Sequence, residues 1–484
     1  MAVVLPRTEG MPERERVELE GVLALLEAEP LELEAELGAP VVLTRSDPGV
    51  GPRFLLAVES GSNLLRFDRR ERVLRGAGRD APSLLASLNA LRSLSIREAD
   101  VVIKEHCHDL RGVTQRIVEE VGHTYPAFAL RDLDWEAICA RHVPRILCAA
   151  EPLPLLQEWL AELQDMHTSI RSLPPSLPAP YVLKVEEGKA YFHRIPEGSA
   201  AHAVGVQPGD TLLETDALSW WKRTGAPLHA RSMMAGYRLL AAPEGTMRVL
   251  RARSASGEIR AWRETWSGQP PGRAASWERR PSGAIYLRIV SFRRDLGIDA
   301  LLAAAFHDLH GVDHLIVDLR GNVGGSLEAA RAFRNRFLHE RTLLGSIRFS
   351  VGGGRLSRPQ HLYGEPISAA VPPHVSFLTD ALTYSAAEDA LLGLQGLPHI
   401  RVIGQPSGGG SGRPRTIRLR PDFLLTVSTA LTYDRSGRCV EGAGVPVDYL
   451  LPDSEMEQER AILAAESIPW ISRLSPPANG ASRC

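Results

Sequence analysis

The spacing of apolar and polar residues changes character along the chain. Between residues 96 and 172, apolar residues recur every three to four positions, as in PLLQEWLAELQDM, and this period predicts a helical subdomain. The Pro-rich segment SLPPSLPAP at 172–180 ends that pattern. From residue 181 to 264, short runs such as YVLKVEE, TMRVLRAR and EIRAW predict a β-rich domain.

Beyond residue 283 the predicted elements alternate between strand and helix. The apolar runs GAIYLRIVSF, HLIVDLR, HVSFLTD and HIRVIG are separated by helical patterns such as SLEAARAFRNRFL, which indicates an α/β core. The polar, Pro- and Gly-rich stretch at 267–283 predicts a connector into this core. Near the N-terminus, residues 15–37 predict a helix and FLLAVES near residue 54 predicts a strand.

These patterns divide the chain into successive units. We expect an N-terminal α+β accessory unit of unknown role, a helical subdomain, a β-rich domain, an α/β core and a short tail, at residues 1–95, 96–180, 181–266, 267–475 and 476–484.

The β-rich domain contains the sequence GSAAHAVGVQPGDTLLETD, which predicts a short helix, a tight turn and a strand. This order resembles a PDZ domain, in which a peptide end adds as a strand beside a sheet edge. The resemblance implies that Gly205, Val206, Gly209 and Asp210 contribute to peptide binding. The alternative is a β-rich insert without a ligand.

The composition narrows the classes of partner. Hydrophobic residues make up 44% and charged residues 24%, with a formal net charge of -2, so no basic excess is present to neutralise nucleic-acid phosphates. We find neither an apolar stretch of signal-peptide length nor one long enough to span a membrane, and we therefore expect a cytoplasmic protein. The five scattered cysteines are typical of free thiols.

No cofactor or metal is expected. The cluster His106-Cys107-His108 is the candidate metal site, and it lacks a second ligand pair at a suitable spacing. The Gly-rich stretch GQPSGGGS at 404–411 imitates a phosphate-binding loop, but Gly410 stands where the lysine of such a loop is needed.

One serine is well placed for nucleophilic chemistry. A predicted apolar strand ends at Asp380, and Ser385 opens the next helix, whose N-terminus favours a neighbouring oxyanion through its free amides. The amide of Ala386 is a natural oxyanion-hole donor. The alternative is structural, because Ser385 and Glu388 have the spacing of a capping box.

A second glycine-rich turn supports the catalytic interpretation. In HLIVDLRGNVGGSLEAA, Gly324 and Gly325 lie between a predicted buried strand and a helix. Small residues at such a turn allow backbone amides to approach a substrate carbonyl.

Four segments, DLRGNVGG, TYSAAE, VIGQPSGGG and VEGAGVPVD, occur in the order found in tail-specific, or C-terminal processing, serine peptidases. The chain resembles this family over roughly residues 100–455. The resemblance implies a crotonase-like β-β-α spiral core, a helical cap formed by the helical subdomain, and an inserted PDZ domain. It also implies a peptide or protein substrate.

One departure from the family pattern concerns the catalytic base. The branch with a Ser-Lys dyad carries its lysine at the position of Gly410, so this chain lacks that base. The branch that includes tricorn protease and resembles interphotoreceptor retinoid-binding protein uses His and Glu instead. By that resemblance His167 is the general base and Glu441 supports the site, through another residue or a water. Their structural alternatives are a helix-end or core histidine and a carboxylate that pins the turn at Gly442.

The resemblance leads to one function with one rival. We expect acyl-enzyme peptide cleavage by Ser385, at or near peptide C-termini, with a general or a dedicated substrate. The rival is a catalytically inactive protein that binds a peptide or a small hydrophobic ligand on the same fold. The sequence leaves the oligomeric state open.

Overall fold

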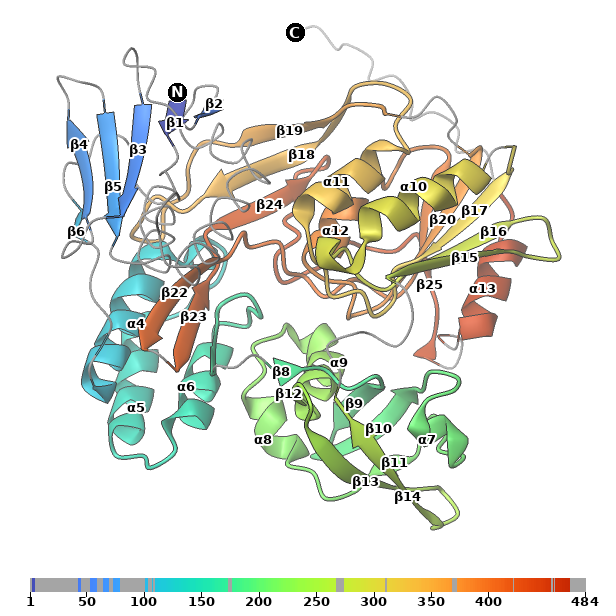
Figure 1. Cartoon of the computed structure of the whole chain (residues 1–484), viewed down its shortest axis with the longest axis horizontal. Helices are drawn as coiled ribbons and strands as arrows, with labels where there is room; N and C mark the ends of the chain where they lie inside the picture. Colours follow the sequence, from blue (N-terminus) through green and yellow to red (C-terminus); the bar gives the residue numbers. More distant parts are fainter. Residues whose placement is uncertain are drawn as a thin grey trace, which may run out of the picture.

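The chain was analysed as a computed structural model, which describes residues 2–4, 42–44, 53–58, 64–68, 73–78, 101–102, 107, 109–172, 176–266, 274–309, 311–367, 372–420, 422–453, 456 and 458–470. The predicted helix at 15–37 and the predicted tail at 476–484 lie outside these residues. Figure 1 shows four groups of elements: an N-terminal sheet, a helical unit, a β-rich domain and an α/β core.

A six-stranded sheet forms the described part of the N-terminal region. Its order is β2-β1-β3-β5-β4-β6. The strands are β1 (Ala2–Val4), β2 (Val42–Thr44), β3 (Arg53–Val58), β4 (Leu64–Asp68), β5 (Val73–Gly78) and β6 (Val101–Val102). The strand that the sequence predicts near residue 54 corresponds to β3.

The helical unit consists of α4 (Leu110–Thr124), α5 (Trp135–Leu147) and α6 (Pro152–Ala161), with the short 3-10 helix η1 (Pro126–Ala129) after α4. Asp109 and Asp134 cap the first two helices through their side chains. The segment that follows α6 differs from the prediction, because β7 (Ser169–Ser172) is a strand and pairs with β23 of the core. This pairing connects the helical unit to the core.

The β-rich domain is a five-stranded sheet with order β14-β13-β11-β10-β9. Its strands are β9 (Val182–Glu186), β10 (Lys189–Arg194), β11 (Thr211–Leu212), β13 (Met247–Arg253) and β14 (Ile259–Thr265), and a small sheet pairs β8 (Ser176–Leu177) with β12 (Ala242–Pro243). Besides the predicted short helix α7 (Ala200–Ala203), two helices were not predicted: α8 (Ala217–Lys222) and α9 (Leu228–Leu239). Both lie between the sheet and the rest of the molecule (Figure 1).

The core is built on a sheet of order β15-β16-β17-β20-β21-β25, parallel from β16 onward. Its strands are β15 (Ala275–Arg279), β16 (Ile285–Ile289), β17 (His314–Asp318), β20 (His374–Thr379), β21 (Ile400–Gly404) and β25 (Tyr449–Leu450). The predicted connector at 267–283 is wrong in part, since its second half forms β15. Proline and glycine on both sides obscure the short alternating run of that strand.

Helices cover both faces of this sheet (Figure 1). The helices α10 (Ile298–Asp308), α11 (Leu327–Asn335) and α12 (Ala386–Leu391) pack on one face with Leu315 and Val317, while α13 (Gln458–Ser467) packs on the other with Ile316. Neighbouring residues of β17 therefore point to opposite layers, which explains its continuous apolar sequence.

Two smaller sheets complete the core. One has the order β19-β18-β24 and the other the order β22-β23-β7. Their core strands are β18 (Thr342–Phe349), β19 (Gln360–Gly364), β22 (Arg415–Arg420), β23 (Phe423–Val427) and β24 (Ala430–Asp434). No helix in the described part of the chain combines the length and the apolar character needed to cross a membrane.

Candidate active site

The turn between β20 and α12 presents Ser385. The carboxylate of Asp380 at the strand end accepts hydrogen bonds from the amides of Leu382 and Thr383, at 2.9 and 3.1 Å, and from that of Gly321 in the neighbouring turn, at 2.9 Å. Ser385 has φ +56° and ψ -122°, a strained conformation for a residue with a side chain. The fold thus holds a half-buried hydroxyl at the start of α12, between the ends of two parallel strands.

His167 lies next to this hydroxyl. The Nε2 atom of His167 and the Oγ atom of Ser385 are 3.0 Å apart, although 218 positions separate the residues in sequence. His167 comes from the loop between α6 and β7, so the pairing of β7 with β23 positions it. With the ring proton on Nδ1, the serine hydroxyl donates to Nε2.

Asp165 fixes the loop that carries His167. Its fully buried carboxylate accepts from the backbone amide of His167 at 2.8 Å and from the hydroxyls of Thr168 and Ser428, each at 2.6 Å. The Ser428 amide in turn donates to the Thr168 hydroxyl at 3.0 Å, which joins the loop to the core. These bonds restrict the backbone on which the imidazole is mounted.

The surroundings keep the imidazole neutral. Burial lowers the pKa of His167 below its ordinary value of 6.5, while the charge of Asp165 opposes this shift. The ring of Tyr384 lies 4.8 Å from the imidazole, measured between centroids. A neutral imidazole at pH 7 is available as a proton acceptor.

The three proposed oxyanion-hole residues lie around Ser385, but their amides differ. A Cβ atom on Gly324 would lie 3.0 Å from Ser385 Cβ and from the Ala386 nitrogen, so this turn directly contacts the serine. The amide of Gly324 donates to Asn322 Oδ1 at 2.9 Å and is therefore occupied in this conformation. The amides of Gly325 and Ala386 donate to no acceptor among the described residues.

Glu441 lies near the site without contacting the imidazole. Its carboxylate accepts from the Ser411 amide at 3.3 Å, and the second oxygen, Oε1, lies 3.7 Å from Arg131 Nη2 without a hydrogen bond. Burial, followed by the charge of Asp165, raises the pKa of Glu441 well above its ordinary value, while Arg131 lowers it. Three buried polar atoms, Nδ1 of His167, Oγ of Ser411 and Oε1 of Glu441, have no hydrogen-bond partner within the described structure.

Glu388 holds the glycine-rich loop against the serine turn. Its buried carboxylate accepts from the Ser385 amide at 3.1 Å, from the Ser407 hydroxyl at 2.5 Å, and from the amides of Gly409 and Gly410, each at 2.8 Å. Burial raises the pKa of Glu388 to about 7, against the effect of these donors. The capping box that the sequence offered as the structural alternative is present between Ser385 and Glu388, and the same carboxylate also joins two loops that are distant in sequence.

The position of the missing lysine has no room for a side chain. A Cβ atom on Gly410 would overlap the ring and hydroxyl of Tyr384, which is buried against it. A side chain at position 410 would displace the ring beside His167.

The four residues expected to bind a peptide form a turn in the β-rich domain. Val206 and Asp210 are buried, and Asp210 accepts from the Gln207 amide at 3.0 Å and from Arg260 at 3.2 Å. Gly205 and Gly209 have positive φ, as the turn requires. These residues are not brought to the sheet edge at β9.

The edge strand β9 is instead covered by α9. A Cβ atom on Gly236 of that helix would overlap the backbone carbonyl of Leu183 in β9, so helix and strand are in direct contact. The other side of α9 faces the core, where Met233 and Met234 pack with Leu382 and Tyr384. In this conformation no strand fits between α9 and β9 at that point.

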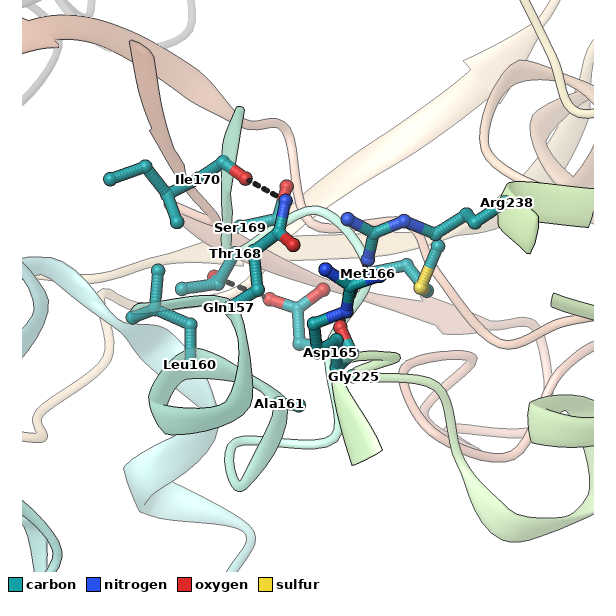
Figure 2. Close-up of a pocket in the computed structure, with 11 residues that line it drawn as sticks. Gln157, Leu160, Ala161, Asp165, Met166, Thr168, Ser169, Ile170, Gly225 and Arg238 are labelled. Carbon is teal, nitrogen blue, oxygen red and sulfur yellow. Dashed lines mark hydrogen bonds between the residues drawn. The ribbon is translucent and has the colours of Figure 1, made fainter. Parts of the chain in front are cut away.

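A small cavity lies beneath the His167 loop, as Figure 2 shows. Its volume is about 10 Å³, enough for about one water molecule, and its lining combines the loop residues Asp165, Met166 and Thr168 with Arg238 and Gly225 of the β-rich domain. The cavity is too small for a substrate side chain. It marks where the β-rich domain contacts the loop that carries the imidazole.

Several residues of the site escaped the sequence analysis. Asp165 has a recognisable signal, because an Asp two residues before a backbone amide donor is typical of an Asx turn. Tyr384, Ser411 and Arg131 have no such local signal, since their contacts come from segments far away in the chain. No group of three or more potential metal ligands occurs among the described residues, which include Cys107 but neither of the histidines beside it.

The fold has counterparts among solved structures. Mature CPAF complexed with lactacystin aligns with 74% of this chain and 97% of its own at 14% identity, with a TM-score of 0.56. A peptidase from Parabacteroides merdae ATCC 43184, described as putative, aligns at 19% identity with a TM-score of 0.48. The photosystem II D1 C-terminal processing protease aligns at 16% identity with the same TM-score. These two alignments cover 74% and 73% of this chain, and 95% and 96% of the others.

The sequence gives the more specific match. The model of peptidase family S41 matches residues 284–451, a span that contains both glycine-rich turns, Ser385 and Glu441. Within this span lies the strained serine at the start of α12, and the imidazole of His167 stands at hydrogen-bond distance from it. Residues 284–451 therefore match peptidase family S41, and the fold of the chain resembles that of mature CPAF.

Proposed function

We propose that the protein cleaves peptides with Ser385 as nucleophile, His167 as general base and Glu441 as the supporting carboxylate. The observation that carries this proposal is the 3.0 Å separation between His167 Nε2 and Ser385 Oγ. A serine hydroxyl is a poor nucleophile until a base removes its proton, and a neutral imidazole at this distance is suited to that task.

The proposed reaction proceeds through an acyl-enzyme. Ser385 Oγ attacks the substrate carbonyl carbon while its proton passes to His167 Nε2. The imidazolium then protonates the leaving amine as the C–N bond breaks. In the second half of the reaction, His167 takes a proton from a water that attacks the acyl carbon, and returns it to Ser385 Oγ as the ester bond breaks. The free amides of Gly325 and Ala386 are the best-placed donors for the oxyanion, because the Gly324 amide is already paired.

Glu441 would act on the imidazole through an intermediary. His167 Nδ1, Ser411 Oγ and Glu441 Oε1 lack hydrogen-bond partners, and a water bound among them would connect the carboxylate to the ring. Such a link stabilises the imidazolium that forms during the reaction.

The finer proposals concern the substrate and the architecture. We infer cleavage at or near peptide C-termini, with one dedicated peptide as substrate in a processing or biosynthetic step, on a crotonase-like core with an inserted PDZ-like domain. The resemblance in sequence to C-terminal processing peptidases supports them. The cytoplasmic location is also a proposal, which cell fractionation tests.

Replacing Ser385 by Ala tests the central proposal. We expect turnover of a tailed peptide library to fall to background and labelling by a fluorophosphonate to disappear, while the thermal melt stays nearly unchanged. Comparing peptides that end in a free carboxylate with the same peptides amidated tests the C-terminal preference. Undiminished turnover by the Ser385→Ala protein would refute the assignment.

A further inference from the structure

Arg131 lies between the two parts of the proposed catalytic site. We propose that Arg131 is a positioning residue, whose guanidinium lies against Glu441 and ties it to the loop that carries His167. This inference rests on the proposed Ser-His-Glu chemistry and assigns a role to a residue of the helical unit, outside the segment that matches the family model.

The guanidinium of Arg131 has contacts on both sides. Its Nη1 atom donates to the hydroxyl of Tyr125 at 2.7 Å and to the carbonyl of Leu163, and its Nη2 atom lies 3.7 Å from Glu441 Oε1. Leu163 lies at the start of the loop in which Asp165 fixes His167. One rigid group thus contacts the imidazole loop and the carboxylate together.

The backbone beside Glu441 leaves space for this group. Gly442 has φ +77°, and a Cβ atom there would lie 2.6 Å from Arg131 Nη2. Any other residue at 442 would push the guanidinium away from the carboxylate. The glycine therefore serves both the turn and the approach of Arg131.

Charge explains why a cation is needed at this place. Glu441 is almost fully buried. Besides Arg131, the charged or titratable groups that interact electrostatically with it are Asp165 from the His167 loop, Glu388 from α12, Tyr125, Tyr384 and Cys439. Burial and the carboxylates of Asp165 and Glu388 raise the pKa of Glu441, and Arg131 opposes them. Without Arg131 the buried carboxyl would keep its proton to higher pH.

Replacement of Arg131 by Met tests this role in two readouts. An opposite charge within about 4–6 Å shifts a carboxyl pKa by about 1–3 units, so we expect the acidic limb of kcat/KM to move up by about one pH unit or more. Because kcat rather than KM depends on the imidazolium, the loss at pH 7 should fall mainly on kcat and be smaller at pH 9. In Arg131→Ala, guanidinium ion at non-denaturing concentration should restore part of the rate.

The ionisation of Glu441 is also measurable without activity. In a Ser385→Ala background, the infrared band of a protonated carboxyl, identified by its disappearance in Glu441→Gln, should titrate at higher pH when Arg131 is Met. Arg131→Lys keeps the charge and should titrate close to the parent protein. Equal titration of the Arg131→Met protein and its parent would overturn the proposal.

Arg415 provides a matched control. It is a buried arginine that contacts α4, the helix that ends just before Tyr125, through Glu120 and through Thr124 Oγ1 at 2.8 Å, and its contacts within the described residues do not include Glu441. Arg415→Met should lower stability without moving the acidic limb or the infrared titration. If wild-type Ser385 neither turns over peptides nor labels, the proposed function fails, and the infrared experiment still decides whether Arg131 favours the ionised form of Glu441.

Discussion

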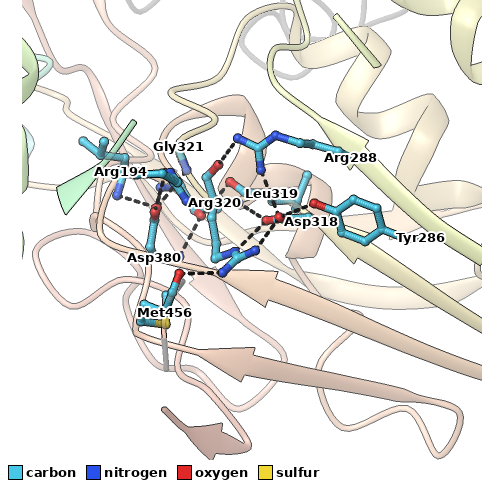
Figure 3. A network of polar contacts seen from close by, with 11 residues as sticks. Arg194, Tyr286, Arg288, Asp318, Leu319, Arg320, Gly321, Asp380 and Met456 are labelled. Atoms are coloured by element: carbon cyan, nitrogen blue, oxygen red, sulfur yellow. Dashed lines mark hydrogen bonds and ion pairs between the residues drawn. The ribbon is translucent and has the colours of Figure 1, made fainter. Parts of the chain in front are cut away.

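Two buried polar clusters lie within the core and differ in how completely their hydrogen bonds are formed. Beneath the active-site turns, Asp318 accepts from Tyr286, from Arg288 and from the backbone and side chain of Arg320, at 2.7–2.9 Å, as Figure 3 shows. Around Ser385, by contrast, His167, Ser411 and Glu441 each retain a buried atom without a hydrogen bond. The saturated cluster supports the scaffold, and the unsaturated one leaves polar atoms for the proton transfer and the bound water that we propose.

The saturated cluster also reaches the serine turn. Arg194 of β10 lies 3.2 Å from Asp380, whose other oxygen holds the Gly321 amide and the turn before Ser385, and Arg320 donates to the Met456 carbonyl at 2.8 Å (Figure 3). The β-rich domain is therefore attached to the base of the site through an ion pair with a fully buried carboxylate.

The largest effect is expected from breaking the saturated cluster. Replacing Asp318 by Ala leaves the buried guanidinium of Arg320 and the partly buried one of Arg288 without their partner, which should lower the free energy of unfolding by about 3–5 kcal/mol in urea titrations. Burial alone would raise the pKa of Asp318, but Arg320 and Arg288 outweigh it and hold this pKa below its usual range.

The sign of the pH dependence follows from that shift. A carboxyl with a depressed pKa contributes stability above its unfolded pKa, and this contribution is lost as the pH falls through the folded value. The stability difference between wild type and Asp318→Ala should therefore be constant above about pH 5 and shrink in more acidic solution. A difference that grows on acidification would contradict the assignment.

The next effect concerns the unsaturated cluster. Glu441→Gln should reduce kcat by about 100-fold, since general acid-base assistance is typically worth about 10²–10⁴. With the titrating carboxyl removed, the remaining acidic limb should lie below pH 6.5, because burial lowers the pKa of His167. Steady-state kinetics between pH 5 and 9 would measure both changes. An unaltered kcat would show that Glu441 has no part in catalysis.

A lysine at position 410 should not rebuild the dyad of related enzymes. In a His167→Ala background, Gly410→Lys is expected to restore no turnover and to lower stability by about 1–3 kcal/mol, because its side chain displaces Tyr384. The double variant with Tyr384→Ala relieves the overlap and provides the matched control. Turnover restored by Gly410→Lys alone would show that the pocket accepts the lysine.

The smallest effect is expected at the edge of the saturated cluster. Arg194→Met leaves Asp380 with its three backbone donors, so the free energy of unfolding should fall by about 1–2 kcal/mol. Thermal denaturation compared with Asp318→Ala would rank the two sites. A loss of stability as large as that of Asp318→Ala would contradict the expectation that the Arg194 ion pair contributes less than the Asp318 cluster.

Much of the α/β core was predictable because each element has a strong local pattern. The runs at β16, β17, β20 and β21 are short, apolar and bounded by turns, and α11 has a regular apolar face. The helices α8 and α9 escaped prediction because they lie inside a segment whose flanking strands dominate the pattern. The strand β7 escaped prediction because its four residues directly follow a segment with a helical pattern, and because its conformation depends on pairing with β23.

The sequence by itself determined the alternation of strand and helix in the core, the glycine-rich turns and the candidate Ser385, since each has a local pattern, and its resemblance to a known family implied His167 and Glu441. The tertiary structure alone decided that His167 Nε2 lies 3.0 Å from Ser385 Oγ, that the Gly324 amide is occupied, and that Tyr384 fills the space at Gly410. It also assigned Arg131 to the same site as Glu441. Distances between segments separated by hundreds of residues depend on strand pairing and packing, which no local pattern encodes.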